Sequence, residues 1–146
     1  MSRSVALVAA ALAGCAGCAG SQRNEDFVPS EAAARAALEA YLAAWQRGDK
    51  SQQVPDTRPP VLVADELRGK GRPLAAYEVL GLVPADAPLC FAVRLTLDGP
   101  REEVRERYVV VGVDPVWVWR YGDYVMITHW EHAMPGDKKS PSPPQK

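Results

Sequence analysis

The sequence predicts an α+β domain in which one long N-terminal helix packs on a curved antiparallel sheet of four to five strands. Residues 32–47 are rich in Ala, Leu, Glu and Arg, and their apolar side chains recur at helical spacing. From residue 74 onward, apolar and polar side chains alternate, as they do in half-buried strands. Turns that contain Gly and Pro separate the alternating runs. A helix that precedes strands joined by short turns is typical of the α+β class.

The predicted helix begins after Ser30, whose hydroxyl can accept a hydrogen bond from a free amide of the first turn. It ends at Gly48, since glycine readily takes the left-handed conformation that follows many helices. We expect Tyr41 and Trp45 to pack in the core, and a pocket or an interface is the alternative for both. The apolar stripe that would face the sheet consists of Ala34, Leu38, Tyr41, Leu42 and Trp45.

The strands are expected after a proline-bearing loop that follows the helix. Residues 61–63 predict a short strand or the entrance to a brief helix. Gly122 and Asp123 predict a tight two-residue hairpin between the last two strands. The main runs that we interpret as strands are residues 74–83, 89–97, 103–113, 116–121 and 124–130.

Length and charge restrict the function class. A chain of 146 residues favours one domain. The formal net charge is −1, and no cluster of basic residues is present, which argues against nucleic-acid binding. The sequence likewise offers no polybasic segment for an anionic membrane.

The N-terminus contains a motif with a chemical meaning. A basic residue, Arg3, is followed by a short apolar run and then by Leu12-Ala13-Gly14-Cys15. The run is too short for a membrane-spanning helix and fits a signal sequence. The four residues resemble the lipobox of bacterial lipoproteins. That resemblance implies that residues 1–14 are a signal peptide and that the acylated Cys15 attaches the protein to a membrane on the extracytoplasmic side of the cell envelope.

The rest of the chain divides by composition. Residues 15–28 predict a flexible tether, residues 29–132 a single α+β domain, and residues 133–146 a disordered, proline-rich tail. Export makes a disulfide between Cys18 and Cys90 chemically feasible, although the spacing does not demand one. We favour a buried, unreactive Cys90.

The order of elements resembles that of the NTF2-like (SnoaL-like, cystatin-like) superfamily, in which an N-terminal helix precedes a sheet that curves into a cone. The resemblance rests on this order and on residues 38–49, which end in Gly48-Asp49. It implies a cone pocket, and enzymes of this superfamily include isomerases and dehydratases. No catalytic residue of the family can be transferred to this chain.

Candidate site residues lie mainly on the last two predicted strands. Trp117, Trp119 and Tyr121 share one face, which is open to three interpretations: core packing, a homodimer interface or a ligand cleft. His129 is an acid–base group on a predicted strand, and it shares a face with Glu131. Two ligands are too few for a usual zinc site, so no metal and no cofactor are expected.

These patterns predict a membrane-tethered lipoprotein with a non-catalytic binding or structural domain. Its ligand is not identifiable from the sequence. Its expected partners are a membrane, through the lipid on Cys15, and a second copy through the sheet face. The alternative is an isomerase- or dehydratase-type enzyme whose pocket is lined by Tyr41, Trp45, Trp117 or Trp119 with His129.

Overall fold

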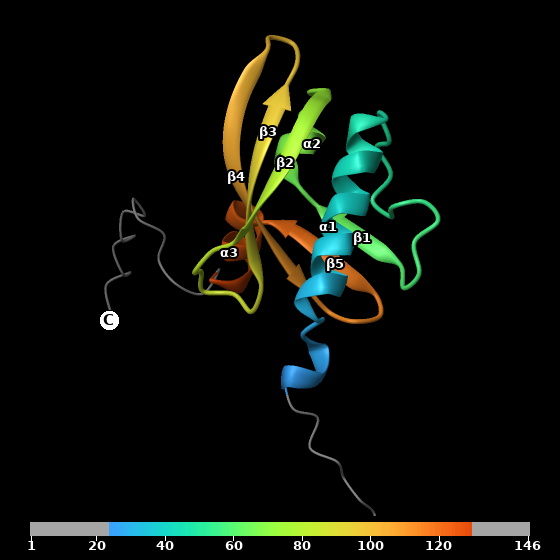
Figure 1. Ribbon diagram of the computed structural model, residues 1–146, viewed down its shortest axis with the longest axis vertical. Helices are drawn as coiled ribbons and strands as arrows, with labels where there is room; N and C mark the ends of the chain where they lie inside the picture. Colours follow the sequence, from blue (N-terminus) through green and yellow to red (C-terminus); the bar gives the residue numbers. More distant parts are fainter. Residues whose placement is uncertain (1–23, 130–146) are drawn as a thin grey trace, which may run out of the picture.

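The computed structural model describes residues 24–129, which form one curved, open sheet of five strands with helices on both of its faces (Figure 1). Helix α1 lies on the inner face of the sheet, and the short helix α3 lies on the outer face. The helices are η1 (Asn24–Phe27), α1 (Glu31–Gln46), α2 (Glu66–Gly69) and α3 (Tyr121–Thr128). The strands are β1 (Val61–Ala64), β2 (Leu74–Leu82), β3 (Cys90–Leu97), β4 (Glu102–Val111) and β5 (Val116–Arg120). The chain is thus of the α+β class.

Local sequence accounts for both ends of α1. The Ser30 hydroxyl accepts a hydrogen bond from the amide of Ala33 at 3.2 Å, and Glu31 adds a negative charge to the first turn. After the helix, Gly48 takes a φ of +87°. The buried stripe of α1 packs against β2, β4 and β5 and, together with the inward side chains of β3, forms the main core. Its members are Ala34, Ala37, Leu38, Tyr41, Leu42, Ala44 and Trp45.

Two polar side chains also fasten α1 to the edge strand β2. Arg35 donates to the carbonyl oxygen of Val79 at 3.4 Å, and Gln46 donates to that of Ala75 at 2.7 Å. Carbonyl groups on an edge strand have no strand partner of their own on the open side. The helix therefore supplies hydrogen bonds that a further strand would otherwise make.

The sheet is mixed, so the prediction of a wholly antiparallel sheet is wrong. The strand order is β1-β5-β4-β3-β2, and β1 runs parallel to β5 with Val61 opposite Val116. The other three strand pairs are antiparallel. The reason is topological: β2, β3, β4 and β5 form an antiparallel meander, and the chain reverses direction four times between β1 and β5, so β5 runs parallel to β1.

The prediction of a fifth strand over residues 124–130 with a hairpin at Gly122 and Asp123 is also wrong, because these residues belong to α3 and its end. Asp123 lies in the first turn and accepts two hydrogen bonds from Arg120, at 3.0 and 2.9 Å. It also accepts one from the amide of Glu66 at 2.9 Å. A negative charge at the start of a helix is favourable, and these bonds, of which the one from Glu66 is long-range, outweigh the strand preference of the local side chains.

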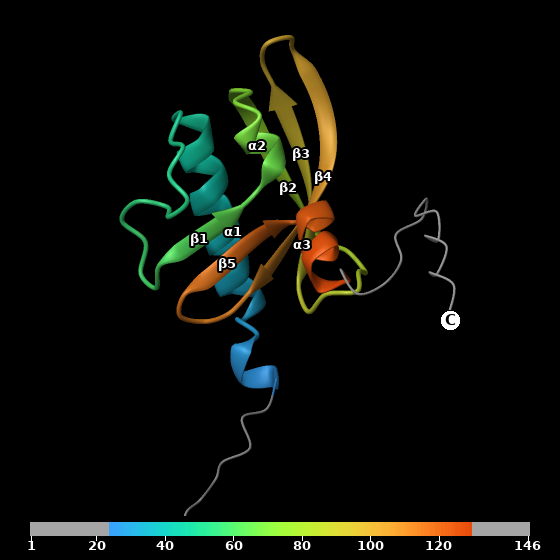
Figure 2. The same cartoon turned by 180° about the vertical axis from the view of Figure 1, so that it is seen from behind.

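Helix α3 covers part of the outer face (Figure 2). It packs on β4 and β5, and Val109 of β4 is completely buried. The residues from 108 to 111 are apolar on both faces, and α1 covers one face while α3 contributes cover to the other. The apolarity of this strand therefore has an explanation within a single chain and does not require a second copy.

Gly112, in the turn between β4 and β5, provides a test of the fold. Its φ is +82°, and a Cβ added there would lie 2.6 Å from the carbonyl oxygen of Pro115. We expect Gly112→Ala to lower the free energy of unfolding by roughly 3 kcal/mol, through conformational strain and this clash. The matched control is Gly99→Ala, which has a φ of +75° and no atom within 4 Å of the added Cβ. It should cost only about 1 kcal/mol. Urea unfolding measures both, and equal costs would contradict the geometry at Gly112.

Candidate functional site

A buried polar cluster lies where α1, β4 and the end of β1 meet. The hydroxyls of Tyr41 on α1 and Tyr108 on β4 each donate to Oδ2 of Asp65 at 2.7 Å. The side chains of Asp65 and both tyrosines are 0% exposed. Hydrogen bonds to a charged acceptor are stronger than neutral ones. Asp65 therefore joins the helix to the middle of the sheet.

The second carboxylate oxygen of Asp65 is also occupied. Oδ1 accepts hydrogen bonds from the amides of Leu67 at 2.8 Å and Arg68 at 3.2 Å, so Asp65 caps the N-terminus of α2. Four donors thus share the two oxygens, which is about the capacity of a carboxylate. The residue is a structural junction for three segments of the chain.

Arg120, at the end of β5, balances the negative charge around this junction. Its guanidinium lies 2.9 Å from Asp123, 3.7 Å from Glu66, 3.8 Å from Asp65 and 4.0 Å from Glu106. The hydrogen bonds to Asp123 are the main cause that raises the pKa of Arg120 above its ordinary value. One cation therefore faces four carboxylates, and it connects α3, α2 and β4.

Burial changes the acid–base properties of this region. It raises the pKa of Tyr108 well above the ordinary value, and the negative charge of Asp65 acts in the same direction. Burial and Asp65 raise the pKa of Tyr41 as well. Burial raises the pKa of Glu106, against the opposing effect of Arg120. Both tyrosines therefore stay protonated as hydrogen-bond donors at neutral pH.

A hollow of about 290 Å³ adjoins this cluster, but the cluster presents no free reactive group to it. The Asp65 carboxylate is inaccessible, and both tyrosine hydroxyls are committed to it. An acid–base catalyst needs a group within hydrogen-bond reach of a substrate. The residues that line the hollow are Lys50, Val63, Asp65, Arg68, Gly69 and Gly71.

A second candidate site is an apolar groove on the outer face, which we call the aromatic groove. The rings of Trp117 and Trp119 are stacked within it, with centroids 5.3 Å apart. Its volume of about 270 Å³ is slightly below the usual size of small-molecule pockets, about 300–1,000 Å³. The groove can therefore hold a small apolar group. Its lining residues are Val111, Trp117, Trp119, Tyr124, Ile127 and Thr128.

The structure separates the aromatic residues that the sequence suggested for one pocket. Tyr41 and Trp45 are buried on the inner face, where their rings stack 6.1 Å apart. Trp117 and Trp119 lie on the outer face of the same sheet. Tyr121 is the first residue of α3, and the guanidinium of Arg107 lies 3.8 Å above its ring. The sheet thus lies between the two aromatic groups.

His129 lies at the end of α3, so its predicted place on a strand is wrong. Its Nε2 is 3.2 Å from Asp86 in the β2–β3 turn, and its Nδ1 is 2.9 Å from the Thr128 hydroxyl. Glu131 lies outside the described residues. Within residues 24–129, no group of three or more His, Cys, Asp or Glu side chains is arranged to hold a metal ion.

Local sequence patterns do not identify Asp65, Tyr108 and Arg120 as a cluster. The signal for Asp65 was its place directly before the helix-forming residues 66–68, which is typical of an N-cap. Its contacts with the tyrosines lie 24 and 43 residues away in the chain. No local pattern predicts contacts over such separations.

Comparisons with protein-family models, curated proteins and solved structures give no match to this chain. The function must therefore be inferred from the residues and geometry of the chain itself.

The pH dependence of stability tests the buried tyrosines. In the unfolded chain tyrosines lose their protons near pH 10, whereas Tyr41 and Tyr108 keep theirs in the fold. The stabilisation from their raised pKa is therefore complete below about pH 10 and is lost above it, at about 1.4 kcal/mol per pH unit for each tyrosine.

We expect Tyr108→Phe to reduce this slope above pH 10 by about 1.4 kcal/mol per pH unit. The lost hydrogen bond should also cost about 2 kcal/mol near neutral pH. Urea unfolding of both proteins near pH 8, 10 and 11 provides the measurement. If the free energy of unfolding fell equally steeply with pH in both proteins, Tyr108 would not be held protonated by the fold.

The reactivity of Cys90 provides a second test. Its side chain is buried opposite Val109, and burial raises the pKa of its thiol. We expect a thiol reagent near pH 8 to react at least about tenfold more slowly with the folded protein than with the protein in urea. A fast reaction in the folded state would contradict the burial. Loss of this thiol until a reductant is added would instead indicate the disulfide with Cys18.

Proposed function

We propose that this protein is an extracytoplasmic lipoprotein of a bacterial cell envelope, attached to a membrane by acylated Cys15, and that its domain is a non-catalytic binding module. The observation that carries the proposal is the sequence Leu12-Ala13-Gly14-Cys15 after a basic residue and a short apolar run. Acylation of Cys15 would supply a membrane contact that the charge distribution of the chain does not provide.

The position of the folded domain supports this attachment. The main helix α1 begins at Glu31, only 16 residues after Cys15. A domain at that distance from a lipid would stay close to the membrane surface. Among residues 24–129, no helix is long and apolar enough to cross a bilayer.

The buried polar cluster favours a binding module over an enzyme. A catalytic site in the core would need an acid–base group that a substrate can reach. Asp65 is saturated by four donors, and His129 lies on the other side of the sheet from Tyr41. In the part of the chain that the structure describes, no observation favours the isomerase or dehydratase alternative.

The aromatic groove is the surface that we propose for ligand contact. It combines two stacked tryptophans with aliphatic walls, and such aromatic residues contribute strongly to many binding surfaces. Its occupant would present a small apolar group. We also propose that the domain is similar to the NTF2-like superfamily in its helix-and-sheet core.

The attachment is tested by Cys15→Ser. We expect this variant to incorporate no labelled fatty acid and to leave the membrane fraction. The matched control is Cys18→Ser, which should keep both the label and the membrane association. Fatty-acid labelling of cells followed by fractionation measures both properties. A Cys15→Ser protein that retains the label would refute the lipoprotein assignment.

A further inference from the structure

The exposed large apolar side chains of the described residues gather toward one end of the molecule, which we call the apolar end. In Figures 1 and 2, η1, the β2–β3 turn, the β4–β5 turn and α3 lie away from the β3–β4 turn, which forms the opposite end. The apolar end thus combines several segments that are distant in the sequence. The side chains, 41% to 56% exposed, are Phe27, Leu80, Leu82, Val113, Met126 and Ile127.

Contacts connect several of these segments. The amide of Gly112 donates to the carbonyl oxygen of Phe27 at 2.8 Å, which places Phe27 beside the turn that holds Val113. Ile127 lines the aromatic groove together with Val111 and Trp117. The exposed apolar surface therefore extends from η1 past the β4–β5 turn to α3. An exposed apolar surface of this kind marks a contact with a protein or a membrane.

The opposite end has a different character. The β3–β4 turn carries Asp98 and Arg101, β4 begins with Glu102 and Glu103, and the nearby helix α2 carries charges of both signs. Among residues 26–129, none of the exposed large apolar side chains lies in these two segments. The described domain thus has one apolar end and one charged end.

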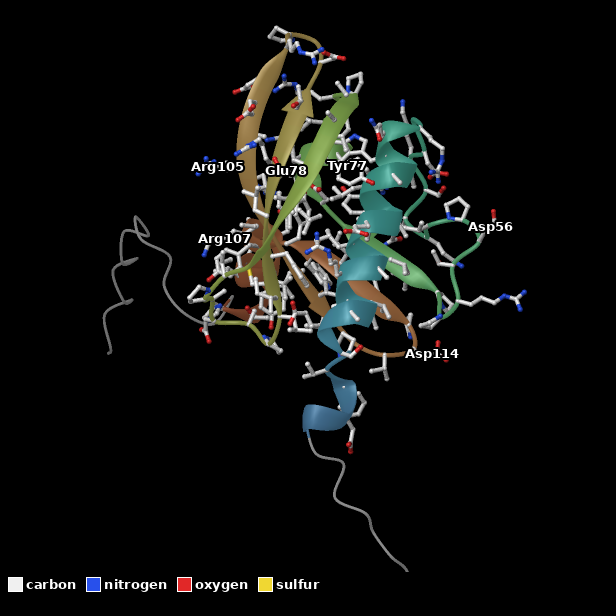
Figure 3. All side chains as sticks on the ribbon, in the orientation of Figure 1. Asp56, Tyr77, Glu78, Arg105, Arg107 and Asp114 are labelled. Atoms are coloured by element: carbon white, nitrogen blue, oxygen red, sulfur yellow. The ribbon has the colours of Figure 1, made fainter. Side chains whose placement is uncertain are left out.

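The charges at the apolar end restrict its partner. The segments 26–28, 83–89, 112–115 and 121–129 themselves contain no lysine or arginine, although the guanidinium of Arg107 on β4 lies over the ring of Tyr121 in α3. These segments carry carboxylates, and Asp114 of the β4–β5 turn is labelled in Figure 3. Anionic lipids attract basic residues and repel carboxylates. The composition of this end therefore suits a zwitterionic lipid surface.

The chain outside the described residues indicates where a membrane would lie. Phe27 is 12 residues from Cys15, so the two are at most about 40 Å apart even in a fully extended chain. The described chain begins at the apolar end (Figure 1). A lipid on Cys15 would hold this end near a bilayer at high effective concentration, so even a weak contact would be populated.

We propose that the apolar end rests on the zwitterionic surface of the membrane that holds the lipid anchor, with Phe27, Val113 and Ile127 in the interfacial region. This inference rests on the acylation of Cys15 proposed above. Aromatic and aliphatic side chains at the edge of an anchored domain are suited to the boundary between headgroups and acyl chains. The charged end, with α2 and the β3–β4 turn, then faces away from the membrane.

The test uses the full mature protein, acylated on Cys15 and held in phosphatidylcholine vesicles. Cys18→Ser removes a second thiol that could react with the dye, and Cys90 is buried. An environment-sensitive dye is attached at Val113→Cys or, as the matched control, at Arg101→Cys in the opposite end. We expect brominated lipids to quench the dye at position 113 by about twofold and to leave the dye at position 101 unchanged.

A second variant separates the surface contact from the anchor. Phe27→Ser, Met126→Ser and Ile127→Ser together alter exposed side chains, so the fold should persist. The combined variant should remain on the vesicles through its lipid but lose the quenching at position 113. Vesicles enriched in phosphatidylglycerol should also reduce the quenching, because of the carboxylates at this end.

Each result supports or overturns the inference. Equal quenching at positions 113 and 101, or none at either, overturns the proposed membrane contact. That result leaves the proposed acylation of Cys15 unaffected. A dye response that ignores bromine and grows with protein density shows a second copy on the apolar end and also overturns the proposed membrane contact. Mass spectrometry that finds no fatty acid on Cys15 overturns the proposed function and this inference with it.

Discussion

The structure depends on one buried carboxylate. Asp65 accepts hydrogen bonds from Tyr41, Tyr108 and two backbone amides, and Arg120 lies close to it. A buried charge is costly unless it accepts as many hydrogen bonds as it can. Here the donors belong to α1, α2 and β4. These elements are therefore required in one relative arrangement. Hydrophobic packing alone would tolerate small shifts of α1 over the sheet, whereas these bonds specify its position.

In this arrangement the two faces of the sheet have different roles. The inner face is filled by α1, and its polar groups bond to one another. The outer face is covered in part by α3, which leaves the aromatic groove between the helix and β5. The outer face thus offers the groove and the exposed apolar side chains beyond it for contact with other molecules. The core supports these surfaces without taking part in their chemistry.

The comparison of α1 with α3 shows how far local sequence predicts this fold. The bounds and the buried stripe of α1 follow from its capping residue, its helix-forming composition and its apolar spacing. Helix α3 has aromatic and β-branched residues that favour a strand, and it owes its conformation to bonds from Asp123 to Arg120 and Glu66. Glu66 lies 57 residues from Asp123 in the chain, so the local pattern does not predict that contact, whereas the pair of Arg120 and Asp123 is local.

The difference between local patterns and distant contacts also explains which features of the candidate sites were predictable. The faces of Trp117 and Trp119 were predictable, since side chains alternate along a strand. Their separation from Tyr41 and Trp45 was not, because it depends on which face of the sheet α1 covers. The parallel pairing of β1 with β5 depends in turn on the complete path of the chain. Sequence patterns therefore predicted the elements and their faces better than the contacts between distant elements.

The parallel pair of β1 and β5 also determines how much of the chain must be synthesised or translocated before the sheet can be completed. β2, β3 and β4 pair with neighbours in sequence, whereas β1 must wait for β5, more than 50 residues later. Until β5 arrives, Val61 and Val63 have no strand beside them, and closing so long a loop costs entropy. A chain delivered from its N-terminus, by a ribosome or a translocation channel, would therefore reach its finished sheet only after residue 120 has been released. The early segments of such a chain must stay soluble, or be protected by chaperones, for nearly the whole of its delivery.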